Sequence, residues 1–228
     1  MLRGALLICR KDLALLGGRG GGLVQALLLG LLLIFIFSLT RAPGETVSPQ
    51  AAAAIFWLAS LFCQVLLFTA LYALEEGDGQ RQALLLAPLP VQSVWLGKGL
   101  AGLALLVLAQ LVFLPASVIF LDQTGTGSPA AGLATVLLTD LGLAALGSLL
   151  GALAQGAAGQ GGRESLFSIL AFPLLLPLLL AGIRTGAIFF GLAETEGFGG
   201  WIRLILACDA VFIGLGLLLF GFVYDSQE

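Results

Sequence analysis

Long apolar stretches separated by short polar segments make up most of this chain. A helix needs about 20 mostly apolar residues to cross the hydrocarbon core of a bilayer. The stretches that come close to this length lie at residues 22–39, 51–74, 99–121, 130–154, 165–183 and 202–223. They predict six transmembrane helices. We therefore expect an all-α integral membrane protein whose 228 residues form a single transmembrane domain, residues 1–228.

The first 20 residues carry too much charge to cross a membrane, yet they show a helical pattern. Apolar residues recur at steps of four and three, which places them on one helical face: Leu2, Leu6, Cys9, Leu13 and Leu16. The basic residues Arg3, Arg10 and Lys11 lie off this stripe. The pattern favours an N-terminal helix that lies in the membrane interface. The alternative is a positively charged leader that only sets the topology.

Composition excludes most other classes of protein. Hydrophobic residues make up 59% of the chain and charged residues only 10%, whereas a soluble domain carries about 25% charged residues. A soluble enzyme, a nucleic-acid binder and a disordered linker are therefore disfavoured. The net charge of −3 gives no global attraction for nucleic acid.

The distribution of Lys and Arg predicts the orientation of the chain, because cytoplasmic loops of membrane proteins are enriched in these residues. If there are six spans, seven of the ten basic residues lie on the side of the N-terminus and three on the other side. Both termini are therefore predicted to be cytoplasmic.

The longest predicted cytoplasmic connection, residues 75–98, has a charged start and a proline-interrupted end. Its short apolar run predicts a helix over residues 80–87 that lies parallel to the membrane and ends at the prolines. We interpret this connection as a docking surface for a cytosolic partner, and the alternative is an ordinary solvated turn. Its candidate residues are Glu75, Glu76, Asp78, Gly79, Arg81, Pro88 and Pro90.

The fifth predicted span contains Pro173 and Pro177. Each proline leaves a carbonyl of the preceding turn without its helical donor, so a kinked or broken helix is expected. Moving or substrate-lining helices of transporters are often broken in this way, although a static kink is an equally good interpretation.

Two charged residues are candidates for a pathway or an interface. Asp140 lies within the fourth span and must face protein, water or the interface, since an unpaired carboxylate in lipid is unfavourable. An interhelical hydrogen bond is its simpler role. Arg184 ends the fifth span and either binds an anionic group or snorkels to the interface. In the fourth span, Gly147 and Gly151 form a GxxxG step that permits close helix packing.

The chain lacks the residue sets of the common catalytic and cofactor sites. It has no GxxxxGK[ST] phosphate loop and no His for a triad or for a zinc site, so we expect no catalysis of its own. Its three Cys lack metal-site spacing, and no metal or cofactor is expected to bind directly. The usual iron ligands of haem are His, Met, Cys and Tyr, and none of these occurs here in a haem motif. If the protein does energy-driven work, a separate chain must hydrolyse ATP.

Two strings in the sequence resemble a known family. The string APLPVQSVWLGK, which ends at Lys98 and is preceded by Asp78 and Gly79, is similar to the cytoplasmic loop of haem exporter protein B. The string SLFSILAFPLLLPLLL, residues 165–180, resembles the fifth span of that family. Where the family usually continues Asp–Gly with a small residue, Leu and Glu, this chain has Gln80, Arg81 and Gln82.

The resemblance implies the membrane permease subunit of the cytochrome c maturation ABC transporter, with an ABC-2-like exporter architecture. It implies a homodimer paired with a cytosolic ABC ATPase subunit, in which residues 75–91 couple the two subunits. It also implies partnership with a haem-handling membrane subunit, a small single-span subunit and a periplasmic haem chaperone, in the bacterial cytoplasmic (inner) membrane. Haem is then the substrate of the complex, and ATP is bound by the partner. The alternatives are an ABC-2 permease for another amphipathic or lipid substrate, and a membrane scaffold that does not transport.

Overall fold

The computed structural model of the chain describes residues 1–19, 21–42, 46–75, 84, 86–123, 128–157, 163–192 and 197–225. Side chains are described for these residues except at 19, 129, 155–157, 163–172 and 223–225. The helices are α1 (Leu2–Arg19), α2 (Gly21–Leu39), α3 (Pro49–Ala73), α5 (Gln92–Phe120), α6 (Pro129–Ala157), α7 (Arg163–Gly186) and α8 (Phe198–Asp225). Within these ranges no β-strand forms, in agreement with the predicted all-α class.

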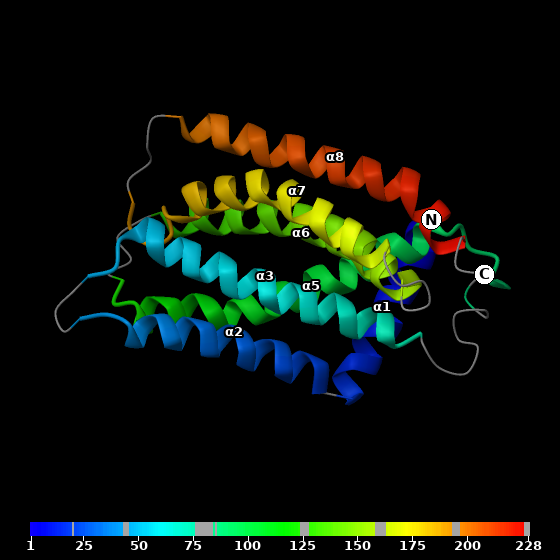
Figure 1. Cartoon of the computed structure of the whole chain (residues 1–228), viewed down its shortest axis with the longest axis horizontal. Coiled ribbons are helices and arrows are strands. Elements are labelled where there is room, and N and C mark those ends of the chain that lie inside the picture. The colour runs from blue at the N-terminus through cyan, green and yellow to red at the C-terminus, as the bar shows by residue number, and fades with distance from the viewer. Residues whose placement is uncertain are drawn as a thin grey trace.

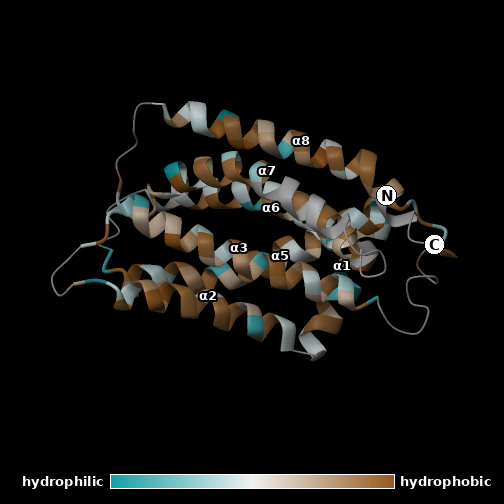
Figure 2. Ribbon diagram, in the orientation of Figure 1, coloured by the Kyte–Doolittle hydropathy of each residue, from teal (hydrophilic) through white to brown (hydrophobic). Residues whose placement is uncertain are grey.

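The helices α2 to α8 lie lengthwise beside one another, and α1 lies across one end of this bundle (Figure 1). Both termini are at that same end. Brown, hydrophobic residues cover much of the length of α2, α3, α5 and α8 (Figure 2). This arrangement is that of a membrane bundle with one helix at its edge.

Five helices of the described chain are long and apolar enough to cross a membrane: α2, α3, α5, α6 and α8. In α7 the residues with described side chains form a shorter apolar stretch, Pro173–Gly186. The multi-span class is therefore confirmed, whereas the sixth span and the orientation of the termini stay predictions.

Local sequence signals mark the beginnings of two spans. Ser48 precedes α3, and its hydroxyl oxygen accepts a hydrogen bond from the backbone N–H of Ala51 at 3.3 Å. Ser128 does the same for Ala131, at 3.4 Å, before α6. In both cases proline occupies the first helical position, where its missing N–H is not needed.

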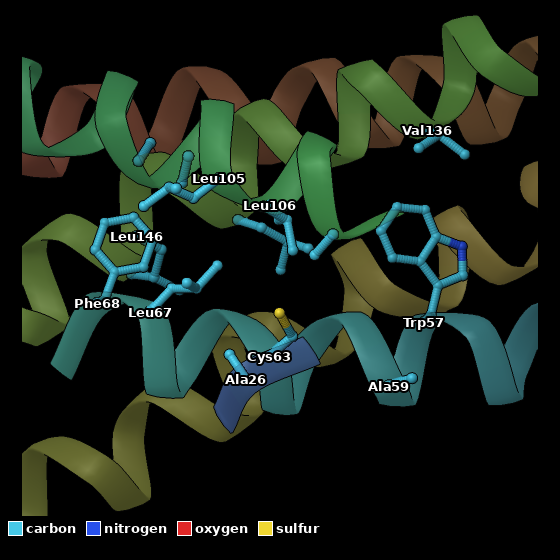
Figure 3. Close-up of a cluster of buried hydrophobic side chains, with 14 of the residues drawn as sticks. Ala26, Trp57, Ala59, Cys63, Leu67, Phe68, Leu105, Leu106, Val136 and Leu146 are labelled. Carbon is cyan, nitrogen blue, oxygen red and sulfur yellow. The ribbon is translucent and has the colours of Figure 1, made fainter. Parts of the chain in front are cut away.

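The helix α6 is central, because it packs against α3, α5, α7 and α8. Its GxxxG step faces α3, as a Cβ atom built on Gly147 would lie 2.6 Å from the ring of Phe68, and one built on Gly151 would lie 2.5 Å from that of Tyr72. The predicted close approach at this step is thus confirmed. The neighbouring core is apolar and includes Cys63, Leu67, Leu106 and Leu146 (Figure 3).

The buried face of α1 differs from the predicted stripe. Leu2 and Leu6 are exposed, and the buried residues follow another helical line: Ala5, Ile8, Cys9, Asp12 and Leu16. Leu2 and Leu6 thus belong to the predicted apolar stripe but not to the face that packs on the bundle, and the interfacial position of α1 stays a prediction. An ion pair across the helix interface makes Asp12 part of the buried face.

The helix α7 runs through Pro173 and Pro177 without interruption in the described backbone. Of the kinked or broken helix that the sequence predicts, the continuous backbone is compatible with the kink, which stays a prediction. Each proline removes one backbone donor, but the hydrogen bonds on either side can hold the helix together.

Candidate functional site

A buried cluster of charged residues lies where α1, the end of α3 and the first third of α5 meet. At its centre is Lys98 of α5, whose side chain has no exposed surface. Its Nζ lies 2.8 Å from Oε1 of Glu75 and 3.5 Å from Oδ2 of Asp12, and it donates a 2.8 Å hydrogen bond to the carbonyl of Leu71. The ammonium also lies 4.6 Å from the centre of the Tyr72 ring, within range of a cation–π contact.

Two positive and two negative charges balance in this cluster. Lys11 of α1 lies 3.0 Å from Asp12 and 3.8 Å from Glu75, and its side chain is 41% exposed. Lys98, Asp12 and Glu75 are almost completely buried. Since an isolated charge in a low-dielectric interior is strongly unfavourable, each carboxylate depends on these ammonium groups. We call Asp12, Glu75 and Lys98 the ion cluster.

Small residues allow α1 to approach α5 closely enough to form the ion cluster. A Cβ atom built on Gly97 would lie 2.8 Å from both the carbonyl oxygen of Ala5 and the Cβ of Ile8. One built on Gly4 would lie 2.8 Å from the side chain of Leu89. The start of α1 therefore packs on both α5 and the segment that precedes it.

Burial in α1 also affects the thiol of Cys9. Cys9 of α1 lies one turn before Asp12 and is buried. Burial raises the pKa of the Cys9 thiol above its ordinary value, and the negative charge of Asp12 raises it further. At a given pH, a raised pKa leaves less of the reactive thiolate.

Hydrogen bonds continue from the ion cluster into the α3–α5–α6 interface. The hydroxyl of Tyr72 donates to the carbonyl of Ser148 at 2.6 Å. The hydroxyl of Ser148 donates in turn to the carbonyl of Trp95 at 2.9 Å, and the Trp95 indole donates to the carbonyl of Ala145 at 3.2 Å. These bonds connect three helices directly beside Lys98.

The predicted docking residues have different surroundings. Glu75 is buried in the ion cluster, whereas Pro88 and Pro90 are exposed. The positions Glu76, Asp78, Gly79 and Arg81 lie outside the described residues, as does most of the helix expected over 80–87. Among the described docking residues, Glu75 thus differs from Pro88 and Pro90, because it belongs to the ion cluster.

The remaining predicted positions lie far from the ion cluster along the chain. Asp140 is buried and accepts a 2.8 Å hydrogen bond from the side-chain amide of Gln110 on α5, which is the simpler of its two predicted roles. Arg184 is exposed in the last turn of α7. Of the two prolines of α7, Pro173 is exposed and Pro177 partly buried.

Sequence reasoning missed Asp12, Lys98 and Gln110. Each is a polar residue within or beside an apolar stretch, and this position was the only indication in the sequence that it could be buried. Lys98 directly precedes the third predicted span, where a basic residue looks like an interfacial anchor. Only the folded structure brings Asp12 to it from 86 positions earlier in the sequence.

The fold and these contacts define the class of protein: a multi-span α-helical membrane protein with a peripheral N-terminal helix. A family model described as CcmB protein matches residues 3–222. The chain therefore belongs to the CcmB protein family.

Two proteins named heme exporter protein B are similar to this chain in sequence. Heme exporter protein B of Rhodobacter capsulatus is 30% identical over 190 residues, which cover 78% of this chain and 81% of that protein. Heme exporter protein B of Paracoccus denitrificans is 31% identical over 186 residues, which cover 80% of this chain and 83% of that protein. The match thus extends over most of the length of each chain.

Proposed function

We propose that the protein is the permease subunit of an ABC transporter that handles or exports haem for cytochrome c maturation in the bacterial cytoplasmic membrane. Membership of the CcmB family and the printed names of the two relatives support the haem assignment. The chain itself performs no catalysis in this proposal. A separate ATPase subunit binds and hydrolyses ATP, and haem is the substrate of the assembly.

The ion cluster is the observation that carries the mechanical part of the proposal. Glu75 and Lys98 stand at the two ends of the 75–98 connection and contact each other, and Asp12 ties α1 to the same point. A force applied to the connection would reach α3, α5 and α1 together. ATP-driven closure of the ATPase would then move these helices relative to α6 and α7, and this movement would drive haem delivery or release of a haem-loaded periplasmic chaperone.

The docking surface itself is assigned to Glu76, Asp78, Gly79 and Arg81, together with Pro88 and Pro90. Both termini are cytoplasmic in this proposal, so the connection faces the ATPase. The functional unit is a homodimer with six spans in each copy, and it works with a haem-handling membrane subunit and a small single-span subunit.

Substitution of the charged docking residues tests the proposal. The variant Glu76→Ala/Asp78→Ala/Arg81→Ala removes two acids and one base but leaves Glu75 in place. A matched control, Glu194→Ala/Glu196→Ala/Arg203→Ala, removes the same charges in and beside the connection between α7 and α8. Because Arg184 is itself a candidate pathway residue, Arg203→Ala takes its place in the control. We expect only the first variant to lose copurification of the ATPase and to lower haem-stained cytochrome c in a complemented deletion strain.

Two results would contradict this function. Normal cytochrome c spectra in the deletion strain would remove the haem assignment and favour a permease for another amphipathic substrate. Unchanged copurification of the ATPase with the first variant would remove the docking assignment while leaving the haem assignment in place.

A further inference from the structure

Two carboxyl groups lie inside the bundle on different sides of α6. Asp140 is on α6 itself, and its Oδ1 accepts the hydrogen bond from Gln110. The same amide of Gln110 also donates to the hydroxyl of Ser60 on α3, at 3.2 Å. The other oxygen of Asp140, Oδ2, is buried and has no hydrogen-bond partner among the described residues.

Asp209 of α8 approaches α6 from another direction. It is buried, and a Cβ atom built on Gly142 would overlap with its Oδ1. Neither oxygen of Asp209 has a hydrogen-bond partner among the described residues. Since successive residues of a helix are about 100° apart, positions 140 and 142 point in nearly opposite directions. Asp140 and Asp209 therefore lie on opposite sides of α6.

No cation neutralises either group within the part of the chain that the structure describes. The ion pairs found there all involve Lys11 or Lys98, at the end of the bundle where α1 lies. Gln110 donates to Asp140 and also to Ser60, and neither Gln110 nor Ser60 carries a charge. Gly142 and Leu178 pack together beside Asp209. The neighbour of Asp209 in the sequence is Cys208, a thiol without positive charge.

An ionised carboxylate needs several donors or a nearby cation when it leaves water. Within the described part of the chain, Asp140 has one donor, which it shares with Ser60, and Asp209 has none. A neutral carboxylic acid avoids the unfavourable burial of charge, and the added proton binds directly to a carboxylate oxygen. The surroundings of both residues thus fit the acid better than the anion.

We propose that Asp140 and Asp209 are proton-binding residues of the membrane interior, each holding one proton while α6 is packed between its neighbours. The proton comes from water and forms an O–H bond, so no other reactant is needed. Movement of α6 that admits water would favour release of these protons. The helix would then couple a change of shape to a change of protonation.

Infrared spectroscopy of the purified full chain in lipid vesicles tests this directly. A protonated carboxyl has a C=O stretching band apart from those of carboxylates, and the band shifts in D2O. We expect the band at neutral pH in the wild type, about half of it in Asp140→Asn or Asp209→Asn, and its loss in the double variant. The control Asp122→Asn changes an exposed acid at the end of α5 and should leave the band unchanged.

The infrared band of the wild type alone provides a second test, which does not depend on how the variants fold. At pH 8 the band should persist in the folded protein and vanish when the protein is unfolded in detergent. Absence of the band from the folded wild type, or its persistence in the folded double variant, would overturn the proposal. A band that disappears on adding sodium would also overturn it and would indicate a metal-cation site. None of these results depends on transport, so they stand apart from the test of the proposed function.

Discussion

Lys98 and Glu75 lie 2.8 Å apart, Nζ to Oε1, and so close the two ends of the 75–98 connection against each other. The contact fixes the spacing between the end of α3 and the first turns of α5. Because Asp12 shares the same ammonium, α1 is fixed to both helices at this point. The ion cluster is therefore a joint between three segments that are far apart in the sequence.

Replacing Lys98 with Met should destabilise the protein strongly. The change leaves two buried carboxylates without their central cation, and breaking a buried ion pair on one side costs about 3–5 kcal/mol. Thermal unfolding in mild detergent, followed by the loss of monodisperse protein, measures this. The control Lys11→Met removes a partly exposed partner and should cost at most about 1 kcal/mol. Equal stability of the two variants would refute a structural role for Lys98.

Removing the charges together should be milder than removing one. In Asp12→Asn/Glu75→Gln/Lys98→Met no ion is left buried without a partner, so part of the stability lost in Lys98→Met should return. The same thermal measurement applies. A triple variant less stable than Lys98→Met would mean that the carboxylates have other partners that matter more.

Gly97→Ala should displace α1, whereas Gly99→Ala should not. The added methyl group at Gly97 meets the backbone oxygen of Ala5 at 2.8 Å, and a backbone cannot move aside as a flexible side chain can. At Gly99 the nearest atoms would be 3.8 Å away, an ordinary contact distance. Limited proteolysis of the N-terminal segment compares the two variants, and identical cleavage rates would contradict the close packing of α1.

Alkylation of Cys9 should be slow in the folded protein. Its pKa is higher in the folded than in the unfolded chain, so at any one pH less of the reactive thiolate is present. In a Cys63→Ala/Cys208→Ala background, maleimide labelling should speed up as pH rises and speed up more on unfolding. Adding Lys98→Met should accelerate labelling of the folded protein as α1 detaches. Rapid labelling of Cys9 in the parent variant would contradict the buried position.

Tyr72→Phe should lower stability by about 0.5–1.5 kcal/mol, the usual net contribution of one hydrogen bond. The hydroxyl donates to the carbonyl of Ser148, whereas the ring that faces Lys98 is retained. Thr69→Val is the matched control, because its hydroxyl bonds only within α3, to the carbonyl of Val65, at an exposed position. Equal thermal stability of the two variants would show that the bond between α3 and α6 contributes nothing.

The spans could be predicted from sequence because bilayer thickness dictates their length. The predicted span 51–74 corresponds to α3, Pro49–Ala73, and 130–154 lies within α6, Pro129–Ala157. The ion cluster could not be predicted, because its members pair across long separations in the sequence. Asp12 is also charged, and a pattern of apolar residues does not indicate that a charged residue is buried.

The position of Asp12 has a consequence for the order of assembly. Its partner Lys98 comes 86 positions later in the chain, which at about 5–20 residues per second is about 4–17 s of synthesis. Until Lys98 has been synthesised, Asp12 lacks the buried cation that it contacts in the folded chain, so we expect α1 to pack on the bundle only after α5 has formed. Docking of α1 is therefore expected to be a late step of assembly, which depends on α5.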